Sequence, residues 1–250
     1  MSATVRAGHE VRVLEAASDV ARAAREEFIR AGQAAIEVRG RFTVALSGGA
    51  TPKALYGSLA TKDLEWGKVE VFFGDERCVS PERRESNFRM AQEALLSRVP
   101  VPEENVHRMR GEAESAEIAA AEYEAELRKV FGEGEGAPRF DLMLLGLGAD
   151  GHTASLFPGS PALEETQRWV AANWVQRLSR TRITLTFPVL NRSAEVLFLV
   201  AGDEKAEAVR RAIEGAPAGL EVPARRVDPP GGKVVWLLDR LSSMRLTPKS

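Results

Sequence analysis

The sequence predicts an α/β fold in which a doubly wound, mostly parallel sheet carries helices on both faces. Apolar runs without polar alternation, such as Leu142–Leu145, are typical of strands that are buried on both sides. Between these runs lie segments rich in Ala, Glu and Arg, with apolar residues at helical spacing. This alternation of strands and helices implies right-handed crossovers and a Rossmann-like sheet.

Strands are expected where short runs of β-branched, aromatic and aliphatic residues end in glycine or polar residues. Val11–Leu14 is short and suits the edge of a sheet, whereas Val196–Val200 is apolar throughout and suits a buried position. In chain order the expected strands are Val11–Leu14, Phe42–Leu46, Val69–Phe73, Asn105–Met109, Leu142–Leu145, Trp169–Asn173, Arg182–Phe187, Val196–Val200 and Val234–Leu238, with a further extended segment at Pro223–Val227.

Helices are expected where alanines and charged residues accompany apolar residues at a spacing of three or four. Ala16–Val38 keeps this pattern over its whole length and predicts a long amphipathic helix. Pro52 suits the first turn of the next helix, and Thr51 suits its N-cap. The expected helices are Ala16–Val38, Pro52–Leu59, a helix from Ser86 or Asn87 to Arg98, Ser115–Phe131, and a helix that ends near Ile213.

The composition indicates one globular domain over residues 1–250. Gly132–Pro138 is the only candidate linker, but it is short and the same alternation continues beyond it. The 34 basic and 36 acidic residues give a net charge of −2, which lacks the basic excess of a nucleic-acid-binding protein. Met1–Glu10 lacks the apolar core of a signal peptide, and no run approaches a membrane span. We therefore expect a cytoplasmic protein without nucleic-acid or membrane partners, as a monomer or small homo-oligomer.

A glycine-rich turn follows the strand Phe42–Leu46 directly and reads Ser47-Gly48-Gly49-Ala50-Thr51-Pro52. A strand, a glycine turn and a helix start together present free backbone N–H groups to an anion. The hydroxyls of Ser47 and Thr51 would add further donors. The pattern therefore predicts a phosphate site at Ser47, Gly48, Gly49 and Thr51, with a tight turn that binds nothing as the alternative.

Three charged residues follow the next strand in Gly74-Asp75-Glu76-Arg77. Carboxyl ends of parallel strands lie at one edge of a sheet, so these residues would share a crevice with the glycine turn. A solvated corner is the alternative. Asn87 could face the same crevice, but on sequence alone capping of the next helix explains it better.

The stretch around which the site is organised runs from Gly146 to Pro158, directly after the strand Leu142–Leu145. It matches G-x-G-x-x-G, but Pro158 and Pro161 interrupt the long helix that a dinucleotide site requires. His152, one of three histidines, lies at this strand end two residues after Asp150. A histidine there is typical of a general base near neutral pH. A loop histidine that hydrogen-bonds the backbone is the alternative.

Other chemistries find little support in the sequence. No paired His or Cys spacing predicts a metal site, and we expect no metal or organic cofactor. The single cysteine, Cys78, rules out a disulfide within the chain and is interpreted as an unreactive thiol. A serine nucleophile lacks its G-x-S-x-G turn.

Together these motifs resemble the glucosamine-6-phosphate isomerase/6-phosphogluconolactonase family. The resemblance rests on Ser47–Pro52, Gly74–Arg77 with Ser86-Asn87, and Gly146–Pro158, which occur in the family's order over nearly the whole chain. It continues through Arg182–Thr186, through Lys205 in the turn Gly202–Lys205, and through Val235–Asp239. The resemblance implies the fold of glucosamine-6-phosphate deaminase and hydrolysis of 6-phospho-D-glucono-1,5-lactone to 6-phosphogluconate.

The resemblance also implies roles for the candidate residues. His152 would take a proton from water and return it to the departing ring oxygen. The glycine-loop amides or Arg77 would stabilise the oxyanion. Asp150 or Asp75 would orient the imidazole or bind sugar hydroxyls. The phosphate would lie on the Ser47–Thr51 turn, with Lys205 and either Arg182 alone or Arg182 with Arg180 balancing its charge. Asn87 and Gly151 are further candidates for substrate binding.

Two rival functions stay open at this stage. The deaminase loop continues from Gly-His into an Ala-Phe-Asn-Glu-Pro type segment, whereas Gly151-His152 is followed here by Thr153–Pro158 without a glutamate. A sugar-phosphate sensor without catalytic activity would keep the phosphate turn but would need no base. Both comparisons favour the lactonase.

Overall fold

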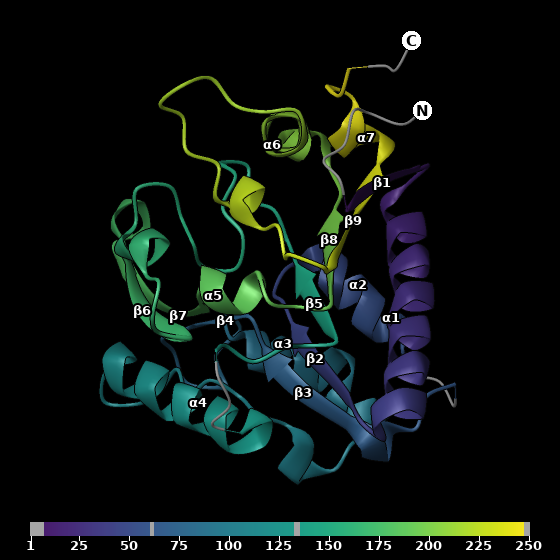
Figure 1. Ribbon diagram of the computed structural model, residues 1–250, viewed down its shortest axis with the longest axis vertical. Helices are drawn as coiled ribbons and strands as arrows, with labels where there is room; N and C mark the ends of the chain where they lie inside the picture. Colours follow the sequence, from purple (N-terminus) through teal and green to yellow (C-terminus); the bar gives the residue numbers. More distant parts are fainter. Residues whose placement is uncertain (1–7, 61–62, 133–135, 248–250) are drawn as a thin grey trace.

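The computed structural model describes residues 8–60, 63–132 and 136–247 (Figure 1). Residues 133–135 of the candidate linker Gly132–Pro138 lie outside these ranges, as does most of Met1–Glu10. Within the described ranges, none of the helices combines the length and the apolar character needed to span a bilayer.

Six parallel strands form the main sheet, in the spatial order β1-β9-β8-β5-β2-β3. This confirms the predicted α/β class with a mostly parallel sheet. The chain runs outward from β2 to β3, but from β5 it proceeds the other way through β8 and β9. The six strands are β1 (His9–Leu14), β2 (Phe42–Leu46), β3 (Val69–Phe73), β5 (Leu142–Leu145), β8 (Glu195–Val200) and β9 (Lys233–Asp239).

Alternate residues of these strands enter two separate apolar cores, one on each face of the sheet. In β5, Leu142 and Leu144 pack in the core that also holds α1 (Ala17–Arg39), α2 (Ala50–Ser58) and α3 (Asn87–Ala94). Met143 and Leu145 pack in the other core, with residues of α4 (Ala116–Phe131) and α6 (Ala206–Ile213). Both faces are therefore apolar, as the unalternating strand sequences predicted.

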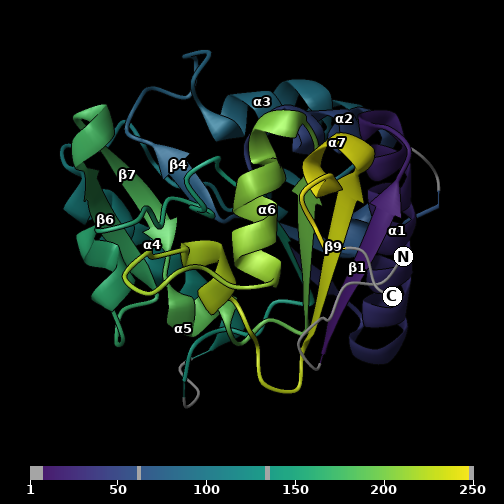
Figure 2. The ribbon, with the colours of Figure 1, turned by 90° about the horizontal axis from the view of Figure 1, so that it is seen from above.

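A second, antiparallel sheet of three strands was not anticipated as a separate unit. It consists of β4 (Asp75–Arg77), β7 (Arg180–Leu185) and β6 (Val170–Val175), in that order. Because only Gly74 separates β3 from β4, the chain passes directly from one sheet into the other. Figure 1 and Figure 2 show the small sheet beside the main one, on the side away from α1. Two short helices, α5 (Phe187–Leu190) and α7 (Arg240–Ser243), follow β7 and β9.

Three local predictions were wrong. Asn105–Met109 forms no strand: Glu103–Asn105 is a 3-10 turn and only Val106 makes an isolated bridge, to Val71 of β3. Pro223–Arg226 is a 3-10 helix rather than an extended segment, since Pro223 suits its first turn. The helix expected to reach Arg98 ends at Ala94, and Leu96–Arg98 is a separate 3-10 turn.

The open edge of β3 is covered by groups from elsewhere in the chain. The hydroxyl of Tyr123, on α4, accepts a hydrogen bond from the Phe73 N–H at 2.9 Å and donates one to the Phe73 carbonyl at 3.1 Å. Farther back on the strand, the His107 N–H donates to the Val71 carbonyl. Such covering matters because an unpaired strand edge can pair with another chain and cause aggregation. In this protein the covered strand β3 also continues directly into β4.

Tyr123→Phe should therefore destabilise the fold by about 1–3 kcal/mol, because it leaves two buried backbone groups of Phe73 without a partner. Urea denaturation would measure this as a lower midpoint with an unchanged slope. A loss below about 0.5 kcal/mol, the level of a neutral surface substitution, would contradict the covering role.

Candidate active site

A cavity of about 320 Å³ lies at the carboxyl ends of β2 and β5, where the two directions of the chain diverge. Open α/β sheets bind ligands at such a point because no crossover covers it. The antiparallel sheet supplies the other wall. Residues that line the cavity are Ser47, Gly48, Gly49, Asp75, Arg77, Asn87, Gly146, Leu147, Gly148, His152, Ala154, Ser155, Phe157, Arg177, Leu178, Arg182 and Lys205.

Nine of the predicted site residues thus line one cavity, although they come from six separate parts of the chain. Three others do not line it. Thr51 lies in the first turn of α2, whose N-cap is Gly49, so the predicted Thr51 cap was wrong. Gly151 lies behind His152 with φ of 86°, and its carbonyl accepts the Ala224 N–H. Asp150 supports His152 from outside the cavity lining.

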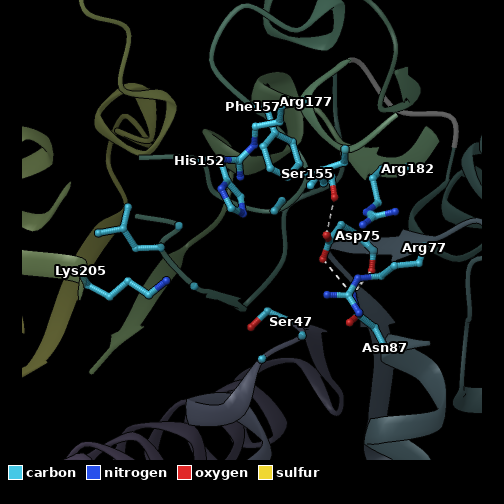
Figure 3. Close-up of a pocket in the computed structure, with 17 residues that line it drawn as sticks. Ser47, Asp75, Arg77, Asn87, His152, Ser155, Phe157, Arg177, Arg182 and Lys205 are labelled. Carbon is cyan, nitrogen blue, oxygen red and sulfur yellow. Dashed lines mark hydrogen bonds between the residues drawn. The ribbon is translucent and has the colours of Figure 1, made fainter. Parts of the chain in front are cut away.

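His152 is held from two sides. Its Nδ1 lies 2.5 Å from Oδ1 of Asp150, and its ring stacks on Phe157 with centroids 4.0 Å apart. Nε2 is then the ring nitrogen left for a ligand, and Figure 3 shows the imidazole at the cavity. Burial alone would raise the pKa of Asp150, but the hydrogen bonds and charge of His152, together with Arg177, lower it. A carboxylate that stays ionised fixes Nδ1 as the donor.

The loop that carries His152 depends on a close backbone approach at Gly148. The Gly148 N–H donates to the His152 carbonyl at 2.8 Å, which brings the imidazole over the glycine. A side chain at this position would overlap the ring and the Asp150 carboxylate, whereas a side chain at Gly146 would meet open space. Gly148 of the G-x-G-x-x-G match is therefore the glycine that admits the imidazole of His152.

Asp75 has a different set of partners from Asp150. Its carboxylate accepts hydrogen bonds from Ser155 Oγ at 2.6 Å and from Asn87 Nδ2 at 3.1 Å (Figure 3). Next to it, the buried Glu76 accepts from the backbone N–H groups of Asn87 and Phe88. Burial raises the pKa of Glu76 even though these N–H groups oppose the shift. Asp150, not Asp75, therefore contacts the imidazole, and Asp75 contributes to the opposite wall.

The glycine turn after β2 is fixed by Tyr56 of α2. The Tyr56 hydroxyl accepts the Ser47 N–H at 2.9 Å and donates to the Ser47 carbonyl at 2.8 Å. The Ser47 amide is thus unavailable to a ligand, which leaves the amides of Gly48 and Gly49. Ser47 Oγ is buried and has no hydrogen-bond partner among the described residues. A buried hydroxyl in this state favours a ligand that accepts or donates a hydrogen bond.

The cavity is strongly cationic. Arg77, Arg177, Arg182 and Lys205 line it, against a single lining carboxylate. Arg77 and Arg182 face each other as register partners of β4 and β7. Burial and the charge of Arg77 both lower the pKa of Arg182. Figure 3 shows Lys205 across the cavity from these two arginines. Like charges so placed destabilise each other, and a bound anion would relieve that repulsion.

The sequence did not single out Arg177, Phe157 or Ser155. Ser155 and Phe157 lie within the His152 stretch, so their position in the motif was a usable signal. Arg177 lies in a 3-10 helix, Gln176–Leu178, between β6 and β7. No motif marks it, and only the tertiary fold brings it to the cavity. Arg180 is exposed and does not line the cavity, so Arg182 alone of these two faces it.

Fold and cavity together define an open α/β protein with a cationic cavity and a histidine–aspartate pair at the carboxyl edge of its sheet. The chain belongs to the family of glucosamine-6-phosphate isomerases/6-phosphogluconolactonase, whose model matches residues 15–236. It is 45% identical to 6-phosphogluconolactonase of Synechocystis sp. over 215 residues, 86% of this chain and 88% of that protein. The 6-phosphogluconolactonase of Nostoc sp. is 41% identical over 214 residues, 85% and 88% of the two chains.

Solved structures agree with this assignment. The 6-phosphogluconolactonase from Trypanosoma cruzi superimposes with a TM-score of 0.85 at 30% identity, over 99% of each chain. A monomeric glucosamine-6-phosphate deaminase matches with a TM-score of 0.76 at 21% identity, over 94% of this chain and 99% of that chain. The second match shows a shared fold alone.

Gly148→Ala should displace His152, because the added methyl group overlaps the imidazole. Gly146→Ala is the matched control, since its methyl group would enter open space. The chain has three histidines, so side-chain ¹⁵N NMR can follow them one by one. We expect the His152 signals to move in Gly148→Ala and to stay in Gly146→Ala. An unchanged His152 spectrum in a folded Gly148→Ala variant would contradict the close approach.

Proposed function

We propose that this chain hydrolyses 6-phospho-D-glucono-1,5-lactone to 6-phospho-D-gluconate, the second step of the oxidative pentose phosphate pathway. The observation that carries the proposal is the Asp150–His152 pair at a cationic cavity of about 320 Å³. The named activity of the Synechocystis and Nostoc relatives supports it. A cytoplasmic location fits a pathway of soluble sugar phosphates and stays a prediction, as does the oligomeric state.

In the proposed mechanism His152 acts as the general base. Nε2 takes a proton from water as the water oxygen bonds to C1 of the lactone. The C1–O5 bond then breaks, and the imidazolium returns the proton to O5, which becomes a hydroxyl group. Asp150 keeps Nδ1 as the donor and stabilises the imidazolium between the two steps. The oxyanion at C1 would be stabilised by Arg77 or by glycine-loop amides.

The phosphate is proposed to lie on the turn formed by Gly48 and Gly49, with Ser47 Oγ as a further contact. Arg182 from one side of the cavity and Lys205 from the other would balance its charge. Asp75 and Asn87, already hydrogen-bonded to each other, would face the sugar hydroxyls. No metal or organic cofactor has a part in this proposal. Among the described residues, no group of three or more His, Cys, Asp or Glu side chains could hold a metal ion.

The loop after His152 supports a lactonase over a deaminase. Its hydroxyl groups have structural partners: Thr153 Oγ1 donates to the Gly146 carbonyl, and Ser155 Oγ donates to Asp75. The segment offers no glutamate at the cavity, which the deaminase pattern has. Proton release from freshly generated 6-phosphogluconolactone, with and without the protein, tests the proposal. Release of ammonia from glucosamine 6-phosphate instead would favour the rival.

His152→Asn should lower kcat by about 10²–10⁴-fold, because it removes the base while keeping a similar size. Binding of 6-phosphogluconate should change little, since the proposed phosphate contacts lie elsewhere. In the native protein kcat/KM should fall at acid pH as the imidazole is protonated, and the variant should lack that limb. Rates are corrected for spontaneous opening of the lactone.

His9→Asn is the control for this variant. His9 begins β1 at the amino edge of the sheet, opposite the cavity, and pairs with Asp228. Its loss should leave kcat unchanged. Near-native kcat in His152→Asn would mean that another residue is the base. A folded variant that loses binding of 6-phosphogluconate would make His152 a binding group.

Arg182→Met and Lys205→Met should each raise KM by the equivalent of about 1.5–3 kcal/mol, the loss typical of a hydrogen bond to a charged group. Arg180→Met removes the same charge from an exposed position two residues away and should leave KM unchanged. Steady-state kinetics with phosphorylated and unphosphorylated gluconolactone would measure the effect. Equal turnover of both lactones by the native protein would refute a phosphate site.

A further inference from the structure

Four side chains form a closed ring of contacts beside the cavity. Arg177 Nη2 lies 3.0 Å from Asp150 Oδ2, and Asp150 Oδ1 contacts His152 Nδ1. His152 stacks on Phe157, and the Arg177 guanidinium lies 5.0 Å from the centre of the Phe157 ring. Figure 3 shows Arg177 and Phe157 next to His152, on the far side of the cavity from Ser47.

We propose that Arg177 is a positioning residue for the reaction: it holds the Asp150 carboxylate, and through it the imidazole of His152, in the orientation that proton transfer requires. The inference rests on the proposed function. It gives the β6–β7 connection, which bears no part of the recognised motifs, a direct role in the site.

The geometry of Asp150 supports this role. Oδ1 is used by His152, through both its Nδ1 and its backbone N–H. Oδ2 is buried and has no aligned hydrogen bond among the described residues, so the guanidinium charge is its partner. Without Arg177 the carboxylate could rotate about its Cβ–Cγ bond, and the imidazole would follow. An error of about 1 Å in placing a catalytic group can cost about 10²-fold in rate.

Phe157 extends the restraint to the ring itself. The imidazole stacks on one face of the phenyl ring at an interplanar angle of 23°, and Arg177 contacts the same phenyl ring. Asp150, His152 and Phe157 all belong to the loop after β5, whereas Arg177 comes from the connection between β6 and β7 of the other sheet. The ring of contacts therefore locks the catalytic loop to the antiparallel sheet.

Arg177 contributes little to overall stability by this contact. Its side chain is 54% exposed, and exposed ion pairs are weak because solvent screens them. A positioning role therefore predicts an effect on turnover without an effect on folding. Direct binding of substrate by Arg177 is the competing explanation, since the residue lines the cavity, and it predicts an effect on KM.

The test is a pair of matched variants, Arg177→Met and Arg180→Met, which remove the same charge from one hairpin. Arg180 is exposed and lies outside the cavity lining. We expect Arg177→Met to lower kcat by about 5- to 50-fold with KM within about twofold of native. Arg180→Met should keep the native kcat and KM. The thermal midpoints of both variants should equal that of the native protein.

Repeating Arg177→Met in an Asp150→Asn background separates the two explanations. If Arg177 acts through the carboxylate, its effect on kcat should shrink to within about twofold there. An undiminished effect in that background, or an effect on KM alone, would overturn the proposal. A native kcat in Arg177→Met would overturn it as well. A native protein that does not hydrolyse the lactone would instead refute the proposed function, so the two failures are distinguishable.

Discussion

The site depends on one constraint of chain topology: β2 and β5 are neighbours, yet the chain leaves them in opposite directions. No crossover helix passes over their carboxyl ends, so two loops meet there above a buried sheet. One loop exposes the amides of Gly48 and Gly49, and the other presents His152. The direct passage from β3 through Gly74 into β4 then places a second sheet beside them. The cavity is the space that these connections leave.

Electrostatics gives this space a preference for anions. The arginines Arg77 and Arg182 lie opposite each other on paired strands. Two like charges so placed repel each other, and the lowered pKa of Arg182 reflects burial together with this repulsion. The carboxylate of Asp150 does not offset this positive charge in the cavity, because His152 and Arg177 already contact its two oxygens. The cavity thus combines an excess of positive charge with one neutralised carboxylate beside His152.

Much of the fold was predictable because strands buried on both faces leave a clear pattern. Phe42–Leu46, Val69–Phe73 and Leu142–Leu145 have the bounds that the sequence indicated. The antiparallel sheet was harder, since β4 consists of three charged residues whose side chains serve the cavity and the α3 cap rather than a core. Asn105–Met109 and Pro223–Val227 look extended locally, but tertiary packing turns their backbones into short 3-10 segments and a single bridge.

Within the site, residues that follow a strand directly could be anticipated, as His152, Asp75 and Ser47 show. Arg177 could not, because its place depends on how the hairpin between β6 and β7 folds back over another loop. The choice between Asp150 and Asp75 as the partner of His152 also needed coordinates. Both aspartates follow strands that end at the same edge, but Asp150 lies in the loop that carries His152, whereas Asp75 begins β4 and contacts Ser155.

The chain has two tyrosines, and both hold strand ends that border the cavity: Tyr56 at Ser47 and Tyr123 at Phe73. Burial raises the pKa of each phenol. Each therefore contributes its full stabilisation below the ordinary tyrosine value of about 10, and the contribution fades as alkali exceeds that value. Tyrosinate absorbance in the ultraviolet would then appear only as these strand ends open, so the protein carries its own optical reporter of cavity disassembly.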